Sequence, residues 1–95
     1  MTMSQSVAGL LLIAYVRLEQ QELSEAIRVI DQTIGQLTEG PVSVEAHEIA
    51  EKLVPISESI EEGEVDYASG LLAGTVRELG GGTMLKRLMA RREMA

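Results

Sequence analysis

Apolar residues recur at helical spacing along almost the whole chain, and this feature restricts the fold more than any other. The clearest stripe is spaced by four and three residues and consists of Leu23, Ile27, Ile30, Ile34 and Leu37. Such spacing places its members on one face of an α-helix, which has about 3.6 residues per turn. The β-branched residues stand at the same spacing, so nothing indicates a strand. The sequence therefore predicts an all-α fold.

Glycine, proline and capping residues divide this pattern into helices. Gly40-Pro41 ends the first stripe, because glycine adopts the C-terminal cap conformation and proline cannot continue a helix. Ser43 is the predicted N-cap of the next helix. Pro55 lies inside that helix, where its ring would clash with a carbonyl one turn earlier, so a kink or a restart is predicted there. Gly63 ends the segment.

A further apolar stripe predicts a helix over residues 65–79, which Gly80-Gly81-Gly82 closes. Thr83 is a candidate N-cap for a last segment from Met84 to about Glu93. Three parts are predicted: an acidic helical bundle (1–79), a glycine hinge (80–82) and a basic amphipathic C-terminal helix (83–95). The bundle is either a four-helix bundle or two stacked helical hairpins.

A faint internal repeat supports the hairpin alternative. Shifting the chain by 42 residues lays Glu22–Gly40 on Glu64–Gly82, with five identical pairs. The identical pairs are Glu22/Glu64, Ala26/Ala68, Thr33/Thr75, Leu37/Leu79 and Gly40/Gly82. A true duplication would mean two hairpins that bury their apolar faces only by stacking. Two unrelated amphipathic helices with similar caps would give the same pattern.

One stretch resembles a tetratricopeptide hairpin. It consists of Leu12–Leu18, then Ser24-Glu25-Ala26-Ile27, then Ile30 and Thr33. That family pairs an A-Y-x-x-L first helix with an E-A-I second helix. The chain departs from the pattern in its longer turn without glycine, in lacking the terminal proline at the usual place, and in its 42-residue spacing. The resemblance implies peptide or subunit binding rather than catalysis.

Charge is distributed unevenly along the chain. The net charge is −7, from 15 acidic and 8 basic residues, which argues against a generally basic nucleic-acid binder. Residues 1–82 carry 14 acidic and 4 basic residues, net −10, whereas residues 83–95 carry 4 basic and 1 acidic, net +3. The apolar run Val7–Val16 is too short to span a membrane and lacks the preceding cations of a secretory signal. A soluble cytoplasmic protein is expected.

No constellation of catalytic or metal-binding residues emerges. There is no Cys and only one His, so disulfides, Cys-based metal sites and multi-His centres are excluded. His47-Glu48-Ile49-Ala50-Glu51 has a glutamate where the zinc-protease helix needs its second histidine. The acidic cluster of residues 58–66 lacks the spacing of a calcium loop, and Gly80-Gly81-Gly82-Thr83 lacks the phosphate-loop pattern. We therefore predict no catalytic residue, no cofactor, no metal and no enzyme.

Three segments are predicted to bind a partner. Leu10, Leu11 and Ile13 lie on a helix that is apolar nearly all round, which favours self-association or an obligate partner. Gly70 and Gly74, together with Ala68 and Ala73, form a small-residue face that either packs closely within the bundle or forms a subunit interface. The C-terminal helix contributes Met84, Leu85, Leu88, Met89, Arg91 and Arg92. It is expected to dock on the chain's own acidic body or on that of a second copy.

These observations predict a small acidic α-helical protein–protein interaction module. It would act as an adaptor, a chaperone-like partner or an inhibitor through its aliphatic helix faces, and it would form homo-oligomers. The alternative is a dimeric nucleic-acid-associated regulatory protein that contacts phosphate through its basic C-terminal tail. The two differ in salt dependence, since phosphate binding weakens steeply with salt.

Overall fold

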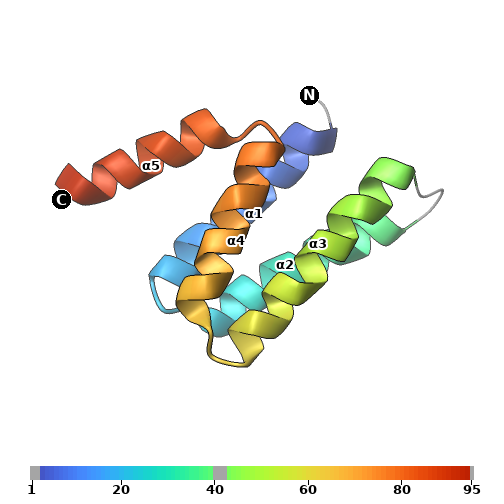
Figure 1. The fold of residues 1–95 in the computed structure, drawn as a ribbon, viewed down its shortest axis with the longest axis horizontal. Coiled ribbons are helices and arrows are strands. Elements are labelled where there is room, and N and C mark those ends of the chain that lie inside the picture. The colour runs from blue at the N-terminus through green and yellow to red at the C-terminus, as the bar shows by residue number, and fades with distance from the viewer. Residues whose placement is uncertain (1–2, 40–42, 95) are drawn as a thin grey trace.

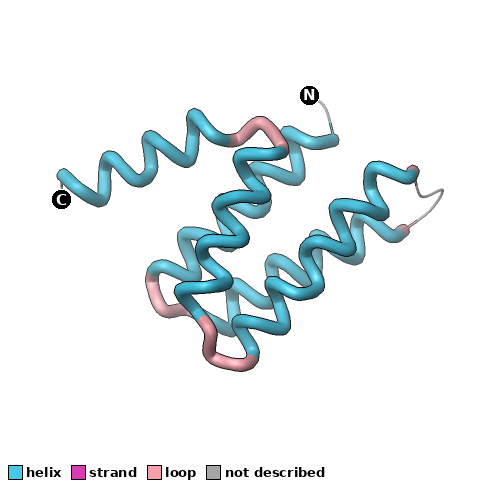
Figure 2. The backbone as a smooth tube through the Cα atoms, in the orientation of Figure 1, coloured by secondary structure: helices cyan, strands magenta, loops and turns pink. Residues whose placement is uncertain are grey.

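Five α-helices account for most of the chain, and the computed structural model describes residues 3–39 and 43–94. The helices are α1 (Met3–Glu19), α2 (Leu23–Thr38), α3 (Val44–Glu61), α4 (Val65–Glu78) and α5 (Gly82–Met94). No strand occurs within the described residues, and Figure 2 shows short loops after α1, α3 and α4. The predicted all-α class is confirmed.

Helices α1 to α4 form a closed ring in which each helix packs on two neighbours. α1 packs on α2 and on α4, and α3 packs on the same two helices. In Figure 1, α3 and α4 lie in front of α2 and α1, while α5 runs outward from the end of α4, away from α2 and α3. The fold is therefore a four-helix bundle built from two helical hairpins, with a projecting C-terminal helix.

The core consists almost entirely of aliphatic side chains from the predicted stripes. Leu11, Leu18 and Ile30 have no exposed surface, and Leu53 and Leu72 are equally buried on the second hairpin. Burying one such side chain stabilises the fold by about 1.5–3 kcal/mol. Because α1 lies between α2 and α4, its nearly uniform apolar surface is largely covered within the monomer.

Each of the three turns after α1, α3 and α4 uses the same backbone device. Gln21, Gly63 and Gly80 have φ angles of 64°, 85° and 90°, in the left-handed region. In each turn, this residue and the one after it donate their N–H groups to carbonyls of the preceding helix. These paired bonds define a Schellman motif, which satisfies carbonyls that the helix end would leave unbonded.

The second hairpin repeats the first with an offset of 42 residues. α1 and α3 end at Glu19 and Glu61, and α2 and α4 begin at Leu23 and Val65. The left-handed turn residues obey the same offset. Six buried positions of α1 also recur in α3: Val7, Ala8, Leu11, Ala14, Tyr15 and Leu18 correspond to Ile49, Ala50, Leu53, Ile56, Ser57 and Ile60.

The second helices of the two hairpins share a buried hydroxyl at the same offset. The Oγ1 of Thr33 donates to the carbonyl oxygen of Val29 at 2.8 Å, and the Oγ1 of Thr75 donates to that of Leu71 at 2.9 Å. A buried hydroxyl needs such a partner, since leaving it unsatisfied costs about 1–3 kcal/mol. Sequence identity and structural role therefore coincide at this pair.

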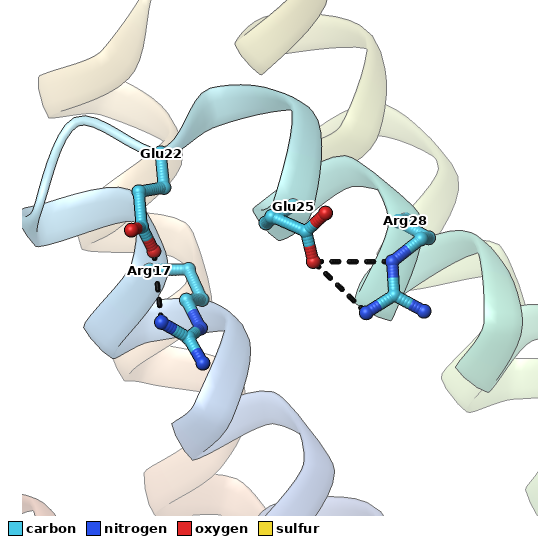
Figure 3. A network of polar contacts seen from close by, with 4 residues as sticks. All are labelled: Arg17, Glu22, Glu25 and Arg28. Atoms are coloured by element: carbon cyan, nitrogen blue, oxygen red, sulfur yellow. Dashed lines mark hydrogen bonds and ion pairs between the residues drawn. The ribbon is translucent and has the colours of Figure 1, made fainter.

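Surface ion pairs surround the first turn. The Nη1 of Arg17 lies 2.9 Å from the Oε2 of Glu22, and the Nη2 of Arg28 lies 2.9 Å from the Oε2 of Glu25 (Figure 3). About half of each side chain is exposed, so each pair contributes at most about 1 kcal/mol. The turn geometry is set mainly by the backbone.

Helix boundaries differ from the sequence predictions at two places. α3 continues through Pro55 without the restart that was one of the two predicted outcomes, and both Pro55 and Glu51, whose carbonyl loses its helical partner, are exposed; the predicted kink stays a prediction. α5 begins at Gly82, and Thr83 lies within it, since the N–H of Leu85 already donates to the carbonyl oxygen of Gly81. The Ser43 N-cap is confirmed by a 3.1 Å bond from the N–H of Ala46. The predicted stop at Gly40-Pro41 lies outside the described residues.

Gly81 is held tightly in the turn between α4 and α5. A Cβ atom at this position would lie 2.6 Å from Cγ1 of Val76 and 3.3 Å from Cβ of Ala8. The segment predicted as a glycine hinge thus contains a close approach at Gly81, where a side chain would clash, and a left-handed residue at Gly80, a conformation that favours glycine. Hinge motion itself stays a prediction.

Candidate functional site

An apolar groove lies between the outer face of α1 and the first half of α5. It has a volume of about 420 Å³. Its apolar lining comes from Gly9, Leu12, Ile13, Val16, Met84 and Leu88. The side chains of Ile13 and Met84 are 49% and 61% exposed. Large exposed aliphatic side chains gathered along one groove are the usual mark of a binding surface.

The groove arises because one strip of α1 stays outside the ring of helices. Gly9, Ile13 and Val16 recur at helical spacing on this strip, and Leu85 anchors α5 beside them with only 1% of its surface exposed. The lack of a side chain at Gly9 keeps this part of the groove open, since a Cβ there would contact nothing within 4 Å.

The basic side chains of α5 project into solvent. Lys86, Arg87 and Arg91 are exposed, and none forms an ion pair with an acid among the residues that the structure describes. Contact of α5 with its own chain depends instead on Leu85 and on the half-buried Leu88. The described cations of the C-terminal helix thus do not dock on the acidic body of their own chain.

A second groove, of about 420 Å³, separates α3 from α4. Gly70 and Gly74 line it together with Tyr67, whose side chain is 60% exposed. A Cβ atom at either glycine would contact nothing within 4 Å, so close packing within the bundle does not require glycine there. The two glycines of the predicted small-residue face therefore line an open groove, whereas Ala68 and Ala73 are buried in the core.

One charged pair closes an end of this groove. The Nζ of Lys52 on α3 lies 2.6 Å from the Oε2 of Glu78 on α4. The hydrogen bond that the Lys52 ammonium donates to Glu78, and the negative charge of Glu78, raise the pKa of Lys52 above the ordinary value of 10.5. Both side chains are more than half exposed, so solvent screens the pair.

The other predicted partner-binding residues fall into different environments. Leu10 is half-buried and lines a hollow of about 240 Å³ between α1 and the ends of α2 and α3. Leu11 and Leu85 are core residues, because they face inward from α1 and α5. Met89 is half-buried against the core. The side chain of Arg92 lies outside the described residues.

The described residues were predicted to form no metal site, and their carboxylate and imidazole side chains are scattered rather than clustered. No group of three or more His, Asp or Glu side chains is placed to hold a metal ion among the described residues. The Nε2 of His47 lies 2.9 Å from the Oε1 of Glu51, and both side chains are more than 60% exposed. Every described buried side-chain polar atom has a hydrogen-bond partner, so the described core contains no unsatisfied polar group of the kind that marks many active sites.

Sequence reasoning missed the exposure of Tyr67 and Val54. Tyr67 precedes Gly70 and Gly74 by three and seven residues, a helical spacing that could have placed the three on one face. Val54 is 43% exposed although its neighbour Leu53 is fully buried. Adjacent aliphatic residues on a helix point about 100° apart, so only the packing shows which of them is buried.

Comparison with known proteins found no matching family, no similar curated protein and no matching solved structure. Within the described residues, no helix is both long and apolar enough to cross a membrane. The grooves and charges described above are therefore the basis on which a function can be argued.

Proposed function

We propose that the chain is a small acidic α-helical protein–protein interaction module that acts as an adaptor, a chaperone-like partner or an inhibitor. The observation that carries this proposal is the apolar groove between α1 and α5, with Ile13 and Met84 exposed along it. A helix or an extended apolar segment of a partner would bury these side chains, each contributing about 1.5–3 kcal/mol when fully buried. The role needs no cofactor and no catalytic residue, and a cytoplasmic location would suit it.

The tetratricopeptide resemblance of residues 12–33 points to the same class of function. In the structure these residues form the α1–α2 hairpin, although α4 returns to α1 and closes the ring. A closed ring has no extended concave surface of the kind that open helical stacks use. Binding through the outer groove is therefore the form of interaction that this architecture supports.

Affinity purification of the tagged protein with identification of bound proteins would test this function. Ile13→Glu should abolish capture of a specific partner, because it places a charge in the groove. Val44→Glu is the matched control, since Val44 is 77% exposed and lies outside the groove. Equal capture by both variants, or no specific capture by the wild-type protein at any salt concentration, would contradict the proposal.

A second candidate function is a dimeric nucleic-acid-associated regulatory protein. The observation in its favour is that Lys86, Arg87 and Arg91 lie exposed on one projecting helix without an acidic partner in the described chain. Binding to phosphate would weaken steeply as salt rises. A titration of double-stranded DNA into the protein at two salt concentrations tests this alternative, and no binding at low salt would exclude it.

A further inference from the structure

One face of α5 is only partly covered by its own chain. Met84, Arg87, Leu88 and Arg91 lie at helical spacing and line a hollow of about 300 Å³ on α5 alone, among the described residues. α5 has 13 residues, and an isolated helix of this length is marginally stable in water. Among the residues of α5 whose side chains are described, only Leu85 is fully buried, and it lies near the start of the helix. An apolar surface rimmed by acids would complete the packing of this face.

The internal repeat identifies such a surface on α3. At the offset of 42 residues, the outer strip of α1 that faces α5, namely Leu12, Ile13 and Val16, corresponds to Val54, Pro55 and Glu58. Val54 is 43% exposed and Pro55 is exposed as well. Exchanging the two hairpins preserves the neighbours in the ring, since each first helix packs on both second helices. The outer face of α3 therefore occupies the same position relative to the bundle as the outer face of α1. Unlike the face of α1, it is not covered by any of the described helices.

Charge distinguishes the two faces. The strip on α3 carries exposed Glu51 and Glu58, and the exposed C-cap residue Glu62 follows at the end of the helix. In the described structure neither Glu58 nor Glu62 forms an ion pair with a basic side chain. The repulsion among these acids is relieved when cations approach. The exposed cations of α5 have the complementary charge, and α5 points away from its own α3 (Figure 1).

We propose that α5 of one copy docks on the outer face of α3 of a second copy. Met84 and Leu88 would cover Val54 and Pro55, while Arg87 and Arg91 of the same helix would face the acids of that strip. A reciprocal contact of this kind closes a two-fold dimer, in which each copy gives one helix and receives one. The proposal rests on the proposed interaction function and names the partner as a second copy of this chain.

The molar mass of the purified full-length chain, measured by sedimentation equilibrium from micromolar to millimolar concentration, tests the proposal. Two charge-reversal variants probe the two sides: Arg87→Glu with Arg91→Glu on α5, and Glu58→Lys with Glu62→Lys on α3. Each should raise the dimer dissociation constant about tenfold or more. The control, Gln32→Lys with Gln36→Lys, adds positive charge to exposed positions of α2 and should change it little.

Mixing the two reversed variants is the decisive measurement. Their opposite reversals make both contacts attractive again, so the mixture should form a heterodimer although neither variant dimerises well alone. A wild-type chain that stays monomeric at millimolar concentration would overturn the proposal while leaving the partner-capture test of the proposed function open. A dimer that both reversals leave intact would overturn the α5–α3 contact but support interaction as the function. A monomer whose Arg87 and Arg91 are needed for DNA binding would overturn it in favour of the nucleic-acid function.

Discussion

Replacing Gln21 by glycine should stabilise the bundle. Gln21 is the single non-glycine residue with a positive φ among the described residues, and it occupies the turn position that Gly63 and Gly80 hold elsewhere. A left-handed backbone conformation costs an L-residue roughly 1–2 kcal/mol because its Cβ crowds the following carbonyl. The Gln21 side chain is exposed, so its removal uncovers no apolar surface.

The expected gain is smaller than the full steric cost. Glycine increases the conformational entropy of the unfolded chain, which offsets roughly 0.5–1 kcal/mol of the gain. A net stabilisation of about 0.5–1 kcal/mol follows. For a domain of this size it corresponds to a rise in Tm of about 2–8 °C.

Urea denaturation followed by far-ultraviolet circular dichroism measures this difference directly. Gly63→Gln is the converse substitution in the second hairpin and should destabilise by a similar amount, because φ is 85° there and a Cβ meets nothing within 4 Å. Gln20→Gly is the control, one residue earlier, and should destabilise slightly. If Gln21→Gly fails to raise the free energy of unfolding, or if Gln20→Gly raises it equally, the left-handed strain is not the cause.

Three further outcomes follow from the structure. Gly81→Ala should destabilise by about 1–3 kcal/mol in the same urea assay, because its Cβ would lie 2.6 Å from Cγ1 of Val76; an unchanged midpoint would show that the turn relaxes freely. Lys52→Met should lower stability by a constant amount from neutral pH to about 10.5 and by less above it. The raised pKa of Lys52 means that its pairing with Glu78 stabilises the fold fully below the unfolded pKa and is lost as pH rises through the folded one; a difference that persists at higher pH would contradict this. His47→Ala should change stability by about 0.5 kcal/mol or less, and stoichiometric zinc that is lost in this variant on elemental analysis would overturn the absence of a metal role.

The sequence predicted the helices well where apolar and polar residues alternate with a clear period. The helix expected from the stripe Leu23 to Leu37 is α2, and the one expected over residues 65–79 is α4. After α3 and α4, glycine adds a second, independent signal, because Gly63 and Gly80 take the left-handed position of the turn. Backbone preference and side-chain pattern agree at these places, so local information suffices.

The burial of individual side chains could not be predicted in two cases. In one, the helix is apolar on nearly every side; in the other, an apolar side chain could pack either in the core or in a surface groove. α1 is apolar on nearly every side, so its period cannot show that Leu11 is fully buried while Ile13 is half exposed. That choice is made by the packing of α2 and α4. Leu85 and Leu88 look equivalent on an amphipathic helix, yet Leu85 enters the chain's own core and Leu88 lines the groove. The amphipathic pattern of a helix predicts that its apolar face will be covered, but it does not show whether the chain's own core or another surface covers it.

The internal repeat separates the residues that form the fold from those that could give it a function. Positions that agree at the 42-residue offset are buried or lie in turns: Leu11 corresponds to Leu53, and Gln21 takes the same left-handed conformation as Gly63. Positions on the outer faces disagree, since Val16 corresponds to Glu58. Packing constrains both hairpins alike, because each buries the same kind of face in one ring. The outer faces are free of that constraint, and their difference leaves one apolar strip beside α5 and one acidic strip without a covering helix. Binding is therefore expected to depend on the exposed residues that break the repeat, and variants at those positions should alter association while leaving the free energy of unfolding nearly unchanged.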